Sequence, residues 1–277
     1  MIAKQLPARH GLLWVLAAWQ LLRRYPRQLT SMTLAYFSLL LVMNLIPYIG
    51  PVLLSLVLPS LNAMVGNACR ALDNNQAVTQ ARLAASLTEQ RVPLFRLGWL
   101  YLTSSLLILI ISSFLLPNLS PEKVDNATRV AEVLPQYGVL LLLVSPLMMA
   151  FWFAPLLTAW HGLPAMKSIF FSFVASWRNW RAFTVYALVV TLVSFIAMII
   201  PTIIGSLLLP SSMGAFAVVV LVMMILLLLI GPVVVTSMYI SYRDVFEAPL
   251  TLDTSNSNSS GENYNSEHGR TSSHLVD

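Results

Sequence analysis

Residues 151–183 read FWFAPLLTAWHGLPAMKSIFFSFVASWRNWRAF, and this stretch decides how the rest of the chain is organised. Its first part is the end of an apolar run that is long enough to cross a membrane. Trp160-His161-Gly162-Leu163-Pro164 then combines a glycine and a proline, which end helices. From Met166 to Arg181 the residues are aromatic and basic, which is typical of a helix lying in a membrane surface. The stretch predicts a crossing, a hinge, and an in-plane helix before the next crossing.

The composition requires lipid as the solvent. Hydrophobic residues make up 57% of the 277 residues and charged residues only 10%, whereas about a quarter of a soluble domain is charged. The net charge of +5 could indicate a nucleic-acid partner, but the basic residues lie at the ends of apolar runs, as in proteins anchored at the inner leaflet. We therefore expect no nucleic-acid binding.

Uncharged runs account for most of the chain, and they predict transmembrane helices because the alternation of a barrel strand is absent. They cover residues 30–46, 52–68, 97–116, 139–160, 182–209 and 214–242. A shorter apolar run, residues 12–22, cannot cross a membrane. It predicts either an interfacial helix with Trp14 and Trp19 near the headgroups or a helix packed on the bundle. We predict an all-α membrane protein with about six transmembrane helices and two interfacial amphipathic helices.

Three regions follow from this pattern. Residues 1–29 form an N-terminal cytoplasmic segment with its interfacial helix, and residues 30–250 form the transmembrane domain. Residues 251–277 are rich in Ser, Asn and Gly and have few apolar residues to bury, so they predict a disordered cytoplasmic tail.

The distribution of Lys and Arg predicts the orientation in the membrane. Of the 16 basic residues, 14 fall on one side of the predicted helices and only Lys123 and Arg129 fall on the other. Basic loops stay in the cytoplasm. Both termini are therefore predicted to be cytoplasmic, in a multi-pass membrane protein.

An internal repeat is one interpretation of the chain. In two places an apolar helix, Arg-x-x-Arg, a crossing and a proline follow in the same order, with matching residues 154 positions apart. The pairs are Arg24 with Arg178, Arg27 with Arg181, Thr30 with Thr184, and Pro47 with Pro201. Both copies start inside, so this would be a degenerate parallel repeat. The alternative is that every helix entering a membrane needs basic residues before it and a breaker after it.

The chemistry expected of an enzyme or an ion-coupled transporter is missing from the predicted crossings. They contain no ionisable residue at mid-depth, although such residues carry proton and ion pathways. There is no Gly-rich phosphate loop and no His or Cys pattern with metal spacing. We predict no enzymatic activity, no cofactor and no metal. A membrane enzyme would require Asp73, Glu89 and His161 to converge at a surface pocket.

The predicted in-plane helix divides into two faces. Ile169, Phe173, Trp177 and Trp180 share one side, with Lys167, Ser172, Arg178 and Asn179 largely opposite. This pattern suits aromatic rings directed toward acyl chains and cations directed toward phosphates, and the alternative is packing on the bundle. The predicted contacts with lipid headgroups, including anionic lipids of the inner leaflet, are Arg24, Arg27, Lys167, Arg178 and Arg181.

Two functions are compatible with these features. The first is a non-enzymatic membrane protein that organises lipids or partner proteins at the cytoplasmic leaflet. The alternative is a passive channel or permease for a small neutral solute, because proline-broken helices often mark transport sites. The neutral polar residues inside the crossings could line such a path, or they could join helices through hydrogen bonds.

Several short motifs resemble an uncharacterised family of proteobacterial inner-membrane proteins. They are residues 151–155, Trp160-His161, Ser172-Phe173, Arg178-Asn179-Trp180 and residues 241–246. The resemblance extends from the region of Leu12 to Phe246. It implies a bacterial inner membrane and a multi-span α-helical bundle, and it implies no activity.

Reporter fusions test the predicted topology. A periplasmic reporter fused after Pro117 should be active, and the same reporter fused after Leu163 should be inactive, with a cytoplasmic reporter giving the opposite result. The reason is the one-sided distribution of Lys and Arg. Finding both positions in one compartment would contradict the predicted orientation.

Overall fold

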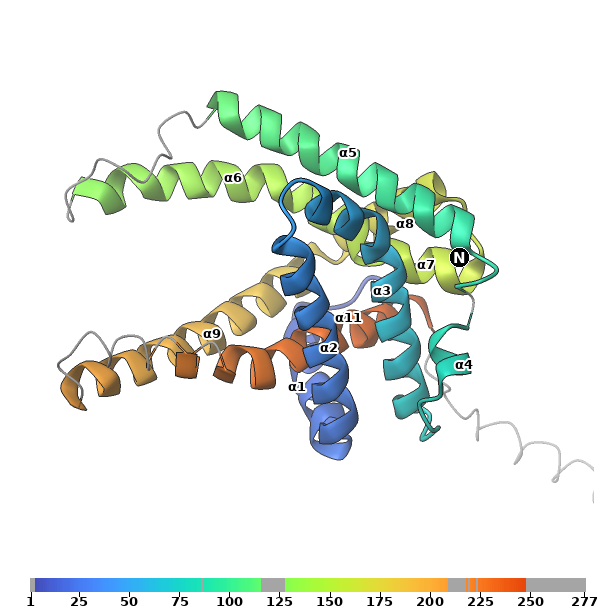
Figure 1. The fold of residues 1–277 in the computed structure, drawn as a ribbon, viewed down its shortest axis with the longest axis horizontal. Helices are drawn as coiled ribbons and strands as arrows, with labels where there is room; N and C mark the ends of the chain where they lie inside the picture. The colour runs from blue at the N-terminus through green and yellow to red at the C-terminus, as the bar shows by residue number, and fades with distance from the viewer. Residues whose placement is uncertain are drawn as a thin grey trace, which may run out of the picture. The chain divides into compact units, whose positions relative to one another are not determined.

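The computed structural model describes residues 3–85, 87–115, 128–208, 218, 220–222 and 224–247. Within these ranges the chain forms helices joined by turns, without a strand (Figure 1). The helices are α1 (His10–Arg24), α2 (Pro26–Asn44), α3 (Ile49–Asp73), α4 (Gln80–Leu83), α5 (Arg91–Leu115), α6 (Thr128–Trp152), α7 (Ala154–His161), α8 (Ala165–Arg178), α9 (Trp180–Leu208), the π-helical turn η1 (Leu226–Ile230) and α11 (Gly231–Phe246). The predicted all-α fold is confirmed. Residues Met1–Phe246 form one compact unit, and the predicted tail, 251–277, lies outside the described residues.

Five helical segments are long and apolar enough to cross a membrane. They are Ile49–Asp73, Arg91–Leu115, Gly138–His161, Trp180–Ile203 and Val220–Phe246. Each overlaps one of the predicted crossings. The remaining predicted crossing, residues 30–46, lies in α2, which has 19 residues and is less apolar because it begins with Pro26-Arg27-Gln28. The structure is that of a helical membrane protein.

The predicted hinge after the fourth crossing is confirmed. Helix α7 ends at His161, and Gly162 adopts a left-handed conformation with φ of 62°. Its N–H closes the helix by donating to the carbonyl of Thr158 at 3.1 Å. Pro164 is extended, with ψ of 145°, and α8 begins at the next residue. Glycine permits the left-handed cap and proline prevents the helix from continuing, so the sequence alone specifies this hinge.

A second break divides the same crossing. Helix α6 ends at Trp152 and α7 begins at Ala154, followed by Pro155 at the start of the helix. The N–H of Phe153 at the break donates to the hydroxyl of Ser172 at 3.0 Å, and that hydroxyl donates to the carbonyl of Met149 at 2.9 Å. Ser176 donates to the same carbonyl at 3.2 Å. Side chains of α8 thus satisfy backbone groups that the break leaves without helical partners.

Helix α8 therefore buries mainly small residues, and of its aromatic residues Phe171 also packs against the core. Ser168, Ser172, Ala175 and Ser176 are buried against neighbouring helices, and α8 packs on α6 and α7. Phe170 and Trp177 are 63% and 62% exposed. The sequence-based placement of Ser172 and Asn179 on the outward polar face is wrong, because both side chains are buried and bonded to the backbone.

The corner between α8 and α9 is closed by Asn179. Its carboxamide oxygen accepts from the N–H of Leu6 at 2.8 Å, and its nitrogen donates to the carbonyls of Lys4 at 2.8 Å and Ala175 at 2.9 Å. One buried side chain therefore joins the N-terminal segment to a helix junction more than 170 residues away. This explains why an asparagine, with both a donor and an acceptor, stands here.

The structure supports the repeat interpretation only in part. Helix α1 ends at Arg24 and α2 begins at Pro26, while α8 ends at Arg178 and α9 begins at Trp180, which is the same offset of 154. However, Pro47 follows the end of α2 whereas Pro201 lies inside α9. Helix α1 packs on α9 and α11, and α8 packs on α6 and α7. The correspondence between the two copies therefore covers one helix, the corner that follows it and the start of the next helix.

Of the two alternatives for residues 12–22, the structure shows packing on the bundle for one face of α1. Trp14 is buried, with its ring 5.2 Å from Phe183 and 6.3 Å from Tyr186, so its predicted place near the headgroups is wrong. The opposite face still carries exposed apolar side chains, including Leu16 and Trp19. One face of α1 therefore packs on the bundle through Trp14, and the opposite face exposes apolar side chains.

Replacing Gly11 with alanine tests this packing. A Cβ atom at Gly11 would lie 2.1 Å from the carbonyl oxygen of Ala182, which is backbone, so α1 would have to move away from α9. Overpacking of this kind costs about 1–3 kcal/mol. We expect Gly11→Ala to lower the thermal-unfolding midpoint of the detergent-purified protein.

The matched control for this substitution is Gly138→Ala in α6, where nothing lies within 4 Å of the new Cβ. It should leave the midpoint unchanged or raise it, because alanine favours helix over glycine. Equal midpoints for the two variants would contradict the close approach of α1 and α9.

Candidate functional site

The predicted headgroup contacts all lie on the protein surface. Arg24, Arg27, Lys167, Arg178 and Arg181 are exposed. The structure does not bring them to a single site. Gly11 near the start of α1 touches Ala182 at the start of α9, whereas Arg24 ends α1 about 20 Å further along the helix. The five cations therefore form two groups, one at the α1–α2 corner and the other on α8 and its corner with α9.

Each corner pairs an arginine with an aromatic ring. The guanidinium of Arg24 lies 5.5 Å from the centre of the Tyr25 ring, and that of Arg181 lies 5.6 Å from the Trp180 ring. Trp180 is 52% exposed. Indole rings prefer the boundary between lipid and water, and Arg181 lies beside such a ring.

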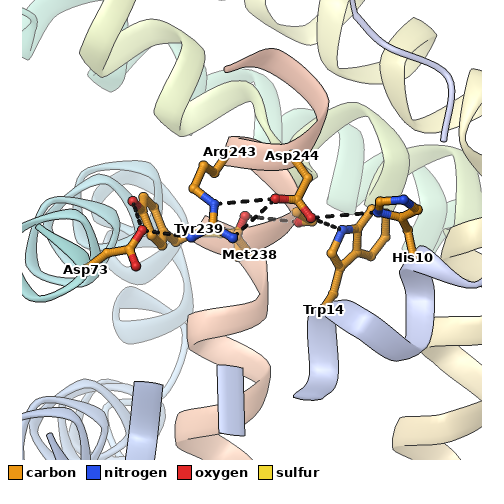
Figure 2. A network of polar contacts seen from close by, with 8 residues as sticks. His10, Trp14, Asp73, Met238, Tyr239, Arg243 and Asp244 are labelled. Carbon is orange, nitrogen blue, oxygen red and sulfur yellow. Dashed lines mark hydrogen bonds and ion pairs between the residues drawn. The ribbon is translucent and has the colours of Figure 1, made fainter. Parts of the chain in front are cut away.

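A separate polar network joins the ends of α3 and α11 (Figure 2). One carboxylate oxygen of Asp73 accepts hydrogen bonds from the hydroxyl of Tyr239 at 2.8 Å and from Nη1 of Arg243 at 2.9 Å. Arg243 also lies 3.3 Å from Oδ1 of Asp244. Burial disfavours the charged guanidinium, and two carboxylates compensate for that cost. Arg243 is consequently bound within the protein and differs from the corner arginines.

The other half of this network reaches α1. Oδ2 of Asp244 accepts from the indole Nε1 of Trp14 at 3.2 Å and lies 3.8 Å from Nδ1 of His10. Figure 2 shows these side chains converging from α1 and α11. Asp244 therefore fixes the N-terminal helix to the end of the last helix. Its role is structural in the part of the chain that the structure describes.

Motif residues that carry the family resemblance make further contacts of this kind. Nε2 of His161 lies 2.6 Å from the hydroxyl of Tyr242, and the indole of Trp152 donates to Ser241 at 3.1 Å. Tyr242 is fully buried and packs edge-on against Trp160 with ring centres 4.8 Å apart. These residues therefore join α6 and α7 to α11.

A polar cleft lies where α3, α4 and α7 meet. It has a cavity volume of about 580 Å³. Glu89 and His161 both line it, but Asp73 does not, because its carboxylate binds Arg243 and Tyr239. The convergence of three groups that an enzyme would require is therefore not formed. Among the described residues no three His, Cys, Asp or Glu side chains are grouped to hold a metal ion.

Sequence reasoning missed this cleft. It treated Arg70 and Arg82 only as residues that set the topology, whereas both line the cavity. The side chains around them are amides, which donate and accept hydrogen bonds. They are Asn67, Asn74, Gln76 and Gln90. The only available signal was the run of amide and arginine residues between two crossings, and such a run is equally typical of a solvated loop.

Comparisons with known proteins bear on the family. No protein-family model matches the chain, and no solved structure matches it. A protein of Burkholderia thailandensis with the printed name "Probable inner membrane protein" is 30% identical over 262 residues. The alignment covers 87% of this chain and 93% of that protein. The similarity therefore spans the membrane helices as a whole.

A double-mutant cycle tests the network in Figure 2. Asp73→Asn and Arg243→Gln should each lower the unfolding midpoint, because each removes the ion pair between these two residues, although Arg243 keeps its contact with Asp244 in the first variant. The pair is partly exposed, so we expect a coupling of about 1 kcal/mol, with the double variant losing less than the sum of the single losses. Thermal unfolding in one detergent measures all four proteins.

Glu89→Gln is the control, since it removes a carboxylate that is exposed at the cleft. It should not change the midpoint. Strictly additive losses for Asp73→Asn and Arg243→Gln would show that the ion pair does not stabilise the fold.

Proposed function

Because the chain belongs to the same family as the inner membrane protein of Burkholderia thailandensis, we propose that it acts in the inner membrane as a lipid-binding protein without catalytic activity. It binds anionic phospholipids at the cytoplasmic leaflet and thereby organises lipids or partner proteins there. The observation that carries the proposal is the pair of surface corners in which an exposed arginine stands beside an aromatic ring.

The positions of the charged side chains favour lipid, and not another part of the protein, as the binding partner of the corner arginines. Arg178 and Arg181 lie on the surface beside Trp177 and Trp180, which are also exposed. Arg243, in contrast, is neutralised by two carboxylates. A basic side chain near an anionic leaflet contributes about 1 kcal/mol to binding. Several such residues on the protein surface, in two groups, give a preference for anionic lipid without a deep pocket.

The proposed orientation places these corners at the cytoplasmic face. It rests on 14 of the 16 basic residues falling on one side of the predicted crossings. Both termini are then cytoplasmic. Anionic lipids of that leaflet would meet the two corners directly.

The cavities favour lipid binding over the alternative, a passive channel. A second cavity of about 200 Å³ lies among α2, α3, α5, α6 and α11, and its lining is mostly apolar. Tyr36 and Asn62, which line it, are bonded to each other at 3.1 Å. This cavity shares no lining residue with the polar cleft. In the described part of the chain, these two cavities do not form a continuous polar path.

Native mass spectrometry tests the lipid proposal. The protein is purified from membranes, exchanged into a mixture of phosphatidylcholine and phosphatidylglycerol, and released from detergent in the spectrometer. Arg178→Gln combined with Arg181→Gln should reduce the retained phosphatidylglycerol severalfold while leaving phosphatidylcholine unchanged, because the substitution removes two surface cations.

The matched control removes two positive charges from the predicted opposite side, through Lys123→Gln and Arg129→Gln. It should not change the retained phosphatidylglycerol. If both double variants retain as much anionic lipid as the parent protein, the lipid proposal fails. If both lose it equally, the binding reflects net charge and the corners have no special role.

A further inference from the structure

We propose that the polar cleft between α3, α4 and α7 is a separate binding site for a phosphate ester that also carries a hydroxyl or amino group. The site is independent of the corner arginines that bind lipid in the proposed function. Binding in the cleft would allow this membrane protein to recognise a soluble phosphate ester or the headgroup of a phospholipid. The argument rests on the construction of the cleft walls, on their charges and on the size of the cavity.

The walls of the cleft are held in place by Asn67. Its amide nitrogen donates to the carbonyls of Leu83 at 3.1 Å and Ala85 at 2.9 Å, which fixes the loop after α4 against α3. Its oxygen accepts from the indole of Trp160 at 2.7 Å, which fixes the end of α7 to the same helix. One side chain thus connects the three segments, and the cleft is formed before any ligand binds.

The two arginines of the cleft are also oriented by the protein. The guanidinium of Arg70 lies 4.7 Å from the centre of the Trp160 ring. Nη1 of Arg82 donates to the carbonyl of Ala77 at 2.6 Å, a bond that uses one of the five N–H donors of an arginine. A guanidinium that is held in a fixed position loses little entropy when it binds an anion, and its planar donors match the oxygens of a phosphate.

Glu89 narrows the class of ligand. A carboxylate in a cleft with two arginines would repel a simple anion, but it accepts hydrogen bonds from a hydroxyl or an ammonium group. Gln90 lies beside Gly162, where its nitrogen would be 3.3 Å from an added Cβ, and it supplies both a donor and an acceptor. The cleft therefore suits a molecule that carries both a phosphate and a hydrogen-bond donor.

The size of the cleft agrees with such a ligand. A volume of about 580 Å³ is far larger than one phosphate ion requires and falls within the range of small-molecule sites. A soluble phosphate ester and the headgroup of a glycerophospholipid share the required chemistry. The experiment therefore needs one arm for each source.

The soluble arm uses isothermal titration of the full-length protein in nanodiscs of phosphatidylcholine, with glycerol 3-phosphate as the probe. Binding should be measurable, and Arg82→Gln should weaken it at least tenfold. Arg82 is exposed on a four-residue helix, so this variant should fold normally. Arg70→Gln should weaken binding as well. Arg178→Gln with Arg181→Gln should leave it unchanged, because these residues lie outside the cleft.

A second probe isolates the role of Glu89. Inorganic phosphate carries the charge of the ester without its hydroxyl groups. Glu89→Gln should strengthen binding of inorganic phosphate, because the substitution removes a repelling charge, and it should weaken the preference for glycerol 3-phosphate over phosphate. A variant that strengthens binding of both probes equally would contradict the hydroxyl-binding role of Glu89.

The lipid arm repeats the titration in nanodiscs that contain phosphatidylglycerol. Loss of the glycerol 3-phosphate signal there, with binding in phosphatidylcholine nanodiscs retained, shows that the phosphatidylglycerol headgroup competes for the cleft and identifies the headgroup as the occupant. An unchanged signal identifies a soluble ligand. Absence of binding in both arms, or binding that Arg82→Gln leaves intact, overturns the proposal, and neither result affects the test of the corner arginines.

Discussion

The break at Phe153, inside a helix that crosses the membrane, is the constraint on which the surrounding structure depends. Lipid offers no hydrogen bonds, so backbone groups freed by a break must find partners within the protein. Ser172 and Ser176 supply them to the N–H of Phe153 and the carbonyl of Met149. Helix α8 must therefore lie against the break, with its serine face inward. Its cations and its largest aromatic rings are left outside for the same reason.

The position of α8 in turn determines the position of the N-terminal segment. Asn179, the residue after α8, binds the backbone of Lys4 and Leu6. That segment leads into α1, where Gly11 allows close contact with α9 and Trp14 reaches Asp244. A requirement for hydrogen bonds in the middle of a crossing is thus transmitted to the first and last helices. The steps at Asn179 and at Trp14 use hydrogen bonds between paired polar groups, and the step at Gly11 uses close packing.

The sequence predicts some of these features and not others, for physical reasons. The hinge at Gly162 was predictable because glycine and proline act locally on the backbone, and the crossings were predictable because burial in lipid requires long uncharged runs. The inward serine face of α8 was not predictable, since serine reads as polar and therefore outward. Asp73 and Arg243 lie 170 residues apart, and no local pattern marks their contact. The cleft combines three segments that meet only in the fold.

The arginines of the chain lie in two kinds of environment, one inside the protein and one on its surface. Arg243 stands between Asp73 and Asp244, and its charge is compensated inside the protein. Arg178 ends α8, whose inward face is already occupied by serine and alanine, and Arg181 lies in the first turn of α9. Because the break at Phe153 requires that inward face of α8, Arg178 and the corner that leads to Arg181 are left on the protein surface. The exposure of these arginines is therefore a consequence of how the backbone is satisfied one helix away.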